Sequence, residues 1–273
     1  MRVGFIGLGS QGGPMARRIA ENGYETTLWA RRAATLEPFA DTPAKTAGSP
    51  AELGAASDLV CLCVVGDDDV REVLYGDTGV LAGLAPGGVV AIHSTVHPDT
   101  CREISEKAAA QQVSVIDAPV SGGGPAVEEG KLLVMVGGDE EVVERCRPAF
   151  ASYADPIVHL GPLGSGQVTK ILNNLLFTAN LGSALSTLEL GESLGIPRVK
   201  LAEVLNGGSA TSKALGSISV FGGTVEGLAP IAGALLQKDV RHAANIAASA
   251  SVPEGTVFTV ADTALTAMGH ARR

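Results

Sequence analysis

The stretch Val3-Gly4-Phe5-Ile6-Gly7-Leu8-Gly9-Ser10-Gln11-Gly12 decides the fold. An apolar run, Val3–Ile6, leads into a G-x-G-x-x-G turn, and a helical pattern follows at Pro14–Asn22. In this context Gly7 permits a tight turn, Gly9 lets the backbone approach a pyrophosphate, and Gly12 lets the helix pack closely on the strand. The N–H groups at the helix start then face the anion. The sequence predicts a dinucleotide site at Gly7, Leu8, Gly9, Ser10, Gln11 and Gly12; the alternative is a glycine-rich turn without a ligand.

Short apolar runs alternate with helical patterns along the first half of the chain. Further strands are predicted at Thr26–Ala30, Leu59–Val65, Val89–His93 and Val113–Ala118, and helices at Asp69–Tyr75 and Pro98–Ala110. Strands rich in Val and Ile that alternate with helices indicate an α/β fold with a doubly wound parallel sheet. Two more strands are expected at Leu132–Val136 and Ile157–Leu160, with a helix from Glu140 to Tyr153 between them.

The pattern changes near Gly161. Gly166–Gly195 contains no proline and predicts one helix of about 28 residues, near 42 Å long. The rest of the chain predicts only helices, at Val199–Leu205, Ala210–Val220, Ala234–Ala250 and Glu254–Met268. We therefore expect a Rossmann-type domain over residues 1–163, followed by an all-α domain over residues 164–273 that begins with a long interdomain helix.

Composition excludes several classes of protein. Hydrophobic residues make up 45% of the 273 residues and charged residues 18%, which rules out whole-chain disorder. A net charge of −9 argues against nucleic acid or an anionic membrane as the main partner. No apolar stretch reaches about 18 residues, no signal sequence is evident, and no C-x-x-C or histidine pair predicts a metal site. These features predict a cytoplasmic globular protein without a metal.

The residues after Thr26–Ala30 bear on the choice of cofactor. An NAD site normally has an acidic residue here to accept from the ribose 2′-OH. This chain has Arg31 and Arg32 instead, and the first acidic residue after them is Glu37. Two guanidinium groups suit a 2′-phosphate, so NADP is predicted, with NAD as the second possibility. The alternative is a solvated basic loop.

Four further motifs resemble those of the β-hydroxyacid dehydrogenases, which include 3-hydroxyisobutyrate dehydrogenase, tartronate semialdehyde reductase and the glyoxylate/succinic semialdehyde reductases. They are Ser94-Thr95-Val96, Asp117-Ala118-Pro119-Val120-Ser121-Gly122-Gly123, the run from Gly164 to Asn174 (GSGQVTKILNN), and Leu236-Gln237-Lys238-Asp239. Together with the glycine turn, they follow the family's order over nearly the whole chain. Gln11, where Met is usual, and Ala30, where Asn often precedes the arginine, depart from the family pattern.

The resemblance implies a role for each motif. Ser121, Gly122 and Gly123 would hold a substrate carboxylate, and Val65, Thr95 and Lys238 would contact the cofactor. Lys170 would be the general acid/base and Asn174 would orient it. The spacing agrees, because residues four apart share one face of a helix, and an ammonium can give a proton to a carbonyl oxygen as hydride reaches the carbon. Each residue also has a structural alternative. Lys170 could be an exposed helix lysine, and Ser121–Gly123 could be a plain turn at the end of a strand. Thr95 could cap the following helix with its hydroxyl, and Lys238 could be a solvated charge.

The expected function is hydride transfer between NADP(H) and a small β-hydroxy acid or the corresponding semialdehyde or keto acid. The partners would be a small carboxylate substrate and further copies of the chain, as a homodimer or homotetramer built by the helical domain. Two alternatives remain. Imine reductases share the architecture but generally lack the lysine at position 170, and a non-catalytic NADP-binding module would not need Lys170 or Asn174.

Overall fold

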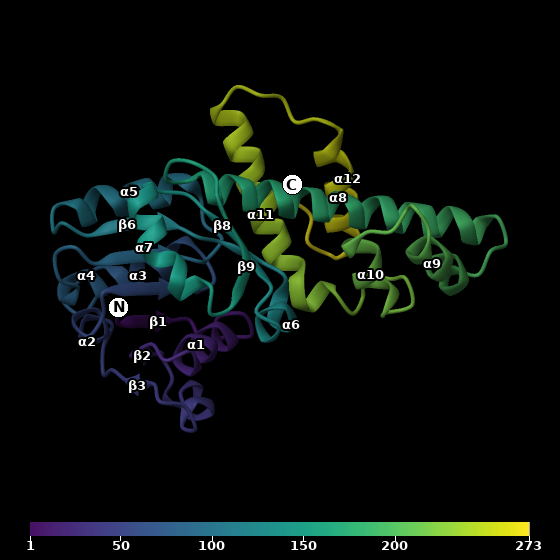
Figure 1. The fold of residues 1–273 in the computed structure, drawn as a ribbon. Coiled ribbons are helices and arrows are strands. Elements are labelled where there is room, and N and C mark those ends of the chain that lie inside the picture. Colours follow the sequence, from purple (N-terminus) through teal and green to yellow (C-terminus); the bar gives the residue numbers. More distant parts are fainter. Residues whose placement is uncertain (273) are drawn as a thin grey trace. The chain divides into compact units, whose positions relative to one another are not determined.

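The computed structural model describes residues 1–272, which form a first compact unit, Met1–Lys170, and a second that begins at Ile171. The first unit contains a six-stranded sheet in the order β3-β2-β1-β4-β5-β6 (Figure 1). The strands are β1 (Val3–Ile6), β2 (Thr26–Trp29), β3 (Lys45–Thr46), β4 (Leu59–Leu62), β5 (Val89–Ile92) and β6 (Ser114–Asp117). Every pair is parallel and in matching register, so the carboxyl ends of all the strands share one edge.

Helices cover both faces of this sheet. Val3 and Phe5 of β1 pack in one core with residues of α1 (Gly12–Glu21). Val60 and Leu62 of β4 pack in the opposite core with residues of α3 (Asp67–Leu74) and α5 (Pro98–Ala109). Successive side chains of a strand point to opposite faces, which explains why these strands are apolar at every position. The predicted doubly wound α/β architecture is confirmed.

Several short elements of the first unit have no counterpart in the sequence prediction. They include β3, the helices α2 (Pro50–Ala55) and α4 (Val80–Gly83), and the 3-10 turns η1 (Ala33–Thr35) and η2 (Glu37–Phe39). A local signal for α2 was available. Ser49 Oγ accepts from the Glu52 N–H over 3.1 Å, and Glu52 Oε2 accepts from the Gly48 N–H over 2.8 Å, which is close to a capping box.

A second, smaller sheet completes the first unit. It contains β7 (Val120–Ser121), β8 (Leu132–Val136) and β9 (Ala154–His159), with β7 antiparallel and β9 parallel to β8. The helices α6 (Gly123–Glu128) and α7 (Glu140–Phe150) connect these strands. The last strand starts at Ala154 rather than at Ile157, and α7 ends at Phe150 rather than at Tyr153.

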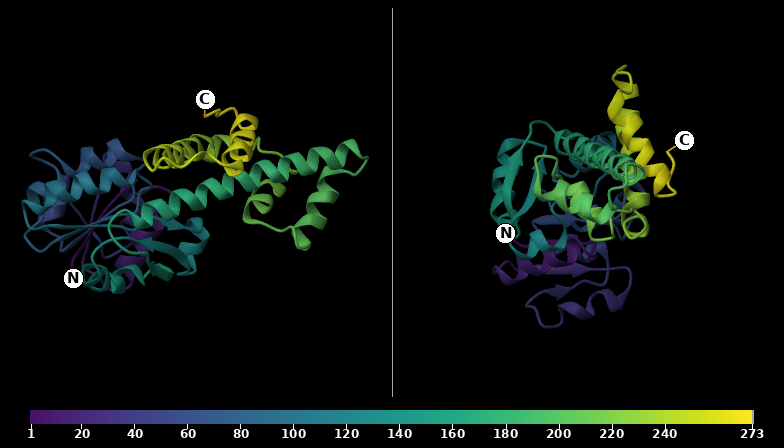
Figure 2. Two further views of the ribbon diagram at one scale, coloured as in Figure 1. Left: turned by 90° about the horizontal axis from the view of Figure 1, so that it is seen from above. Right: turned by 90° about the vertical axis from the view of Figure 1, so that its right-hand side faces the viewer.

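The described residues of the second unit, 171–272, form helices joined by loops and contain no strand, as predicted. The helix α8 (Ser165–Ser193) starts in the first unit and continues into the second without a break (Figure 2). It is followed by α9 (Arg198–Gly207), α10 (Lys213–Ser219), α11 (Ala229–Ser249) and α12 (Thr256–Ala267). Leu181, Leu185 and Leu188 of α8 are buried with side chains from the other four helices. None of the helices formed by residues 1–272 combines the length and the hydropathy that crossing a bilayer requires.

Candidate active site

The glycine turn between β1 and α1 leaves no room for side chains at two of its three glycines. Gly7 has φ +99°, and a Cβ there would lie 2.1 Å from the Cys63 carbonyl oxygen. A Cβ at Gly12 would lie 2.0 Å from the Gly7 carbonyl oxygen. At Gly9, by contrast, no atom lies within 4 Å of the Cβ position. Gly7 and Gly12 are therefore required by the fold, whereas the space beside Gly9 is open to a ligand.

The turn lies at the point where the sheet reverses its winding. The chain runs outward from β1 to β2 and β3, then returns to β4 on the other side of β1. The Cys63 N–H donates to the Ile6 carbonyl over 2.8 Å, so the ends of β1 and β4 lie side by side. Open α/β sheets bind their ligands at such a switch point, outside the carboxyl ends of the strands. Within the turn, Leu8 and Gln11 are half-buried, and Gly9 and Ser10 are exposed.

The two arginines after β2 have different surroundings. Arg31 Nη2 donates to Asp69 Oδ1 and to Glu72 Oε2, each over 2.8 Å, and both acceptors belong to α3. Arg32 is exposed and makes no ion pair with any residue in the described range 1–272. Arg31 is therefore already held by two carboxylates, which the sequence did not indicate.

Hydrogen bonds fix the ends of β4 and β5 to each other and to the start of α8. The Val64 N–H donates to Ser94 Oγ over 2.8 Å. The buried Gln167 side chain donates to the Ser94 carbonyl over 2.8 Å and accepts from the Val96 N–H over 3.1 Å. Gln167 thus holds both backbone neighbours of Thr95, which is half-buried. Val65, in the loop after β4, is 66% exposed.

The buried carboxylate of Asp117, at the end of β6, accepts from the first turn of α8. Its Oδ1 accepts from the Gly164 N–H and its Oδ2 from the Gln167 N–H, each over 2.6 Å. Burial raises the pKa of Asp117, while these two N–H groups oppose the rise because they favour the charged form. No role was predicted for Asp117 from the sequence, although an acidic residue at the end of a strand and a G-x-G sequence at the start of a helix could have indicated this contact.

Lys170 and the Ser121-Gly122-Gly123 turn also belong to the first unit. Lys170 is half-buried in the second turn of α8, shortly after the turn that Asp117 and Gln167 hold. Ser121 ends β7, and Gly122 and Gly123 have φ values of +138° and +75° that favour glycine. Asn174 follows Lys170 by one turn on the same continuous helix, so the two side chains lie on one face of α8.

Within the second unit, Asn174 and Lys238 meet at one acidic residue. Asn174 Nδ2 donates to Asp239 Oδ2 over 2.6 Å, and Lys238 Nζ lies 3.3 Å from Asp239 Oδ1. Asp239 is only 3% exposed. Within the motif Leu236–Asp239, Lys238 was predicted to contact the cofactor, whereas no role was predicted for the adjacent Asp239. The structure therefore adds Asp239 as the residue that orients the Asn174 amide.

Other reactive groups serve packing. His93 is buried, and its Nδ1 lies 2.6 Å from the Ala118 carbonyl and its Nε2 3.2 Å from the Tyr153 hydroxyl. Burial lowers the pKa of His93 to about 4 and raises the pKa of Cys63 to about 12, so both are neutral near pH 7. Over residues 1–272 no group of three or more His, Cys, Asp and Glu side chains is arranged to hold a metal ion.

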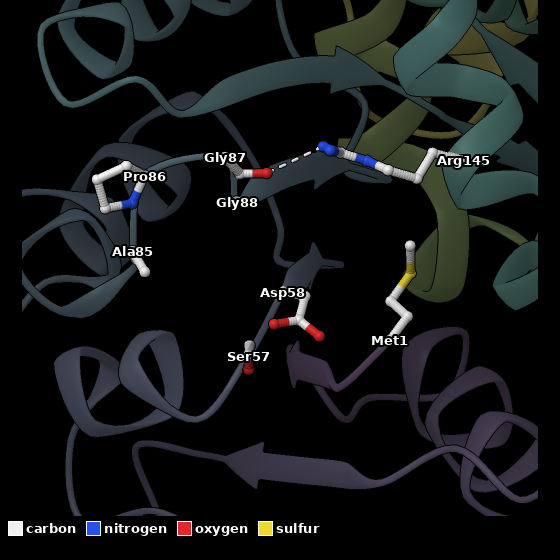
Figure 3. Close-up of a pocket in the computed structure, with 8 residues that line it drawn as sticks. All are labelled: Met1, Ser57, Asp58, Ala85, Pro86, Gly87, Gly88 and Arg145. Atoms are coloured by element: carbon white, nitrogen blue, oxygen red, sulfur yellow. Dashed lines mark hydrogen bonds between the residues drawn. The ribbon is translucent and has the colours of Figure 1, made fainter.

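Two hollows lie at different places in the first unit. One, of about 530 Å³, adjoins the glycine turn and is lined by Leu8, Gly9, Arg17 and Phe39, among others. The other, of about 330 Å³, lies at the amino ends of β1, β4 and β5, where Arg145 donates to the Gly87 carbonyl over 3.0 Å (Figure 3). None of the predicted site residues lines the second hollow, so the candidate site remains at the carboxyl edge of the sheet.

A glycine turn at the switch point of a parallel sheet defines an NAD(P)-binding Rossmann domain. Comparison with known proteins agrees. Residues 2–161 match the family described as the NAD binding domain of 6-phosphogluconate dehydrogenase, and residues 164–272 match the NAD-binding region of NADP-dependent 3-hydroxyisobutyrate dehydrogenase. The chain therefore belongs to the 3-hydroxyisobutyrate dehydrogenase family, the β-hydroxyacid dehydrogenases, and is an NAD(P)-dependent oxidoreductase.

Individual relatives support this placement. The chain is 37% identical, over 77% of its length and 70% of the other, to a probable 3-hydroxyisobutyrate dehydrogenase-like protein of Arabidopsis thaliana. It is 32% identical, over 82% of its length and 76% of the other, to an NAD-dependent L-serine dehydrogenase of Pseudomonas aeruginosa. Among solved structures, it resembles Mycobacterium tuberculosis 3-hydroxyisobutyrate dehydrogenase with L-serine, with a TM-score of 0.84 and 26% identity over 100% of this chain and 96% of the other.

Proposed function

We propose that the protein transfers a hydride between NADP(H) and a small β-hydroxy acid or the corresponding semialdehyde or keto acid, with Lys170 as the general acid/base. The observation that carries this proposal is the anchoring of α8. Asp117 and Gln167 hold its first turn at the carboxyl edge of the dinucleotide-binding sheet, one turn before Lys170. The names of two relatives, a probable 3-hydroxyisobutyrate dehydrogenase-like protein and an L-serine dehydrogenase, support a small β-hydroxy acid as the substrate class.

Different residues of the chain have different roles in the proposed reaction. A bound nicotinamide would supply or accept the hydride. The Ser121 hydroxyl and the N–H groups of Gly122 and Gly123 hold the substrate carboxylate. Lys170 donates a proton to the carbonyl oxygen during reduction and accepts one from the hydroxyl during oxidation. Asn174, whose amide Asp239 orients, fixes Lys170 or the substrate oxygen without adding charge.

We propose NADP rather than NAD as the preferred cofactor. The glycine turn would hold the pyrophosphate, and Val65, Thr95 and Lys238 would contact the rest of the dinucleotide. Arg31 and Arg32 follow β2, the position at which the ribose 2′ group is read. The description of the matched family as NADP-dependent supports this preference, while the NAD-dependent serine dehydrogenase keeps NAD as the second cofactor.

The remaining proposals concern organisation. We propose the dinucleotide-binding domain over residues 1–163 and the helical domain, which supplies the wall of the substrate cleft and the oligomer contacts, over residues 164–273. A homodimer or homotetramer would cover the exposed apolar side chains of the second unit, which include Leu190, Leu194, Val199 and Val204. A cytoplasmic location fits the four free thiols.

Lys170→Ala tests the central assignment. We expect kcat to fall by about 10²- to 10⁴-fold because the proton donor is lost. NADPH binding, measured by fluorescence titration, should change by less than about twofold, or about 0.4 kcal/mol. Lys131→Ala is the matched control, because Lys131 is an exposed lysine of the same unit that pairs with Glu129, and it should keep the full rate. The assay is a panel of semialdehydes and hydroxy acids with each cofactor; retention of most of the rate by Lys170→Ala would remove Lys170 from its role.

A further inference from the structure

We infer that Asp69 and Glu72 set the preference between the two dinucleotides by competing with the 2′-phosphate for Arg31. This inference rests on the proposed role of Arg31 in reading the ribose. Both carboxylates accept from the same nitrogen of Arg31, each over 2.8 Å. All three residues belong to the first unit. Two carboxylates of α3 therefore compete with the cofactor's 2′-phosphate for the Arg31 guanidinium.

The geometry of the guanidinium makes this competition specific. A guanidinium can grip a phosphate with two parallel N–H bonds along either of two edges, Nη1 with Nη2 or Nε with Nη2. Because Nη2 belongs to both edges, and because its two hydrogens go to Asp69 and Glu72, neither edge is open. A two-pronged grip on a 2′-phosphate by Arg31 requires at least one carboxylate to leave. NADH has no 2′-phosphate and requires no such exchange.

Two acidic residues of α3, Asp69 and Glu72, accept from Arg31. Asp67 accepts from the His97 N–H over 2.8 Å and the Thr100 hydroxyl over 2.6 Å, and Asp68 pairs with Arg71 over 3.3 Å. Asp69 and Glu72 are three residues apart, so they share one face of the helix. The side chains of Arg31, Asp69 and Glu72 are 50%, 30% and 64% exposed. Pairs exposed to this degree are weak, so a phosphate can displace them, at a reduced net affinity.

The experiment compares dissociation constants for NADPH and NADH in Asp69→Asn, Glu72→Gln and the double variant of the full chain, at one ionic strength. Each single substitution should tighten NADPH binding by about two- to fivefold, because a neutral amide oxygen holds an edge of Arg31 less strongly than a carboxylate and a negative charge beside the phosphate is removed. The affinity for NADH should stay constant. Asp68→Asn is the matched control, since it removes a neighbouring charge of the same helix turn that pairs with Arg71, and the ratio should not change.

Arg31→Ala separates this inference from the proposed cofactor choice. If Arg31→Ala weakens NADPH and NADH equally, Arg31 does not read the 2′-phosphate and the cofactor proposal fails. Suppose that Arg31→Ala weakens NADPH binding alone. If the double variant then leaves the ratio of the two dissociation constants unchanged, the carboxylates do not compete with the phosphate; if it weakens NADPH binding, they hold Arg31 in position for the phosphate. Either result overturns only the present inference. When Arg31→Ala is combined with the double variant, the increase in NADPH affinity that the double variant causes should become smaller. An undiminished increase would indicate simple charge repulsion between the carboxylates and the phosphate, and it would also overturn the inferred competition.

Discussion

At the scale of single residues, the three glycines of the turn meet two separate demands. Side chains at Gly7 and Gly12 would collide with backbone oxygen atoms at 2.1 and 2.0 Å, so these two glycines are needed for the fold itself. Gly9 has no neighbour within 4 Å of its Cβ position and no unusual φ, so the fold does not require it. We propose instead that glycine at position 9 lets a pyrophosphate approach the backbone.

Gly9→Ala should therefore separate binding from folding. We expect the free energy of unfolding to stay within about 1 kcal/mol of the original, because no clash arises. NADPH and NADH should both bind at least about tenfold more weakly, or about 1.4 kcal/mol, since the added methyl group blocks the pyrophosphate. Gly207→Ala, at a glycine in the second unit that also has nothing within 4 Å, is the control and should bind normally. Unchanged affinity in Gly9→Ala would place the pyrophosphate elsewhere.

At the scale of elements, α8 depends on a residue far from it in the sequence. Asp117 supplies two buried acceptors to the N–H groups of Gly164 and Gln167, and a negative charge at a helix N-terminus is favourable. Gln167 adds a second attachment, to the backbone on both sides of Thr95. The direction and start of α8 are therefore fixed at the carboxyl edge of the sheet, and Lys170 follows one turn later.

Asp117→Ala should affect both stability and turnover. The two N–H groups would be left buried without acceptors, at a cost of about 3 kcal/mol in a urea unfolding experiment. We also expect kcat to fall at least about tenfold because Lys170 is no longer held in place, an effect of about 1.4 kcal/mol.

Asp139→Ala is the control for that variant. Asp139 caps α7 through the N–H groups of Glu141 and Val142, but it is exposed and lies on another helix. It should cost about 1 kcal/mol in stability and leave kcat unchanged. If Asp117→Ala lost stability but kept its kcat, the anchor would not position Lys170.

At the scale of the whole molecule, the two units have separate cores and different surfaces. The first unit buries its apolar residues on both faces of its main sheet. The second unit exposes several large apolar side chains, among them Leu190 at 61% and Leu194 at 71% on α8. Leu190 and Leu194 are four residues apart and share one face of α8, and further copies of the chain are the partner proposed to cover them.

Substitution of both leucines by glutamate tests the oligomer. The wild-type chain should run as a dimer or tetramer in size-exclusion chromatography with light scattering. Leu190→Glu with Leu194→Glu should shift the mass to the monomer, because burying two carboxylates opposes association. Val158→Glu, an exposed apolar position of the first unit, should keep the wild-type mass. A monomeric wild type would contradict the proposed assembly.

The sequence predicts the elements well where a pattern is local. The apolar run and glycines at residues 3–12 predicted the first strand, turn and helix, and the long proline-free run predicted α8, although its start differs by one residue. These elements depend on contacts between residues close along the chain, so the spacing of the apolar residues is enough to predict them. Short elements such as β3 escaped prediction because two residues carry no periodicity and are held only by pairing with β2.

The tertiary structure alone decided which polar groups meet. Arg31 reaches Asp69 over 38 residues of chain, Asp117 reaches Gln167 over 50, and Asn174 reaches Asp239 over 65. No residue pattern specifies such pairs, because their distance depends on how whole strands and helices pack. The candidate chemistry of Lys170 could thus be inferred from its motif, whereas the groups that hold the start of α8, and the two carboxylates that pair with Arg31, became visible only in the folded chain.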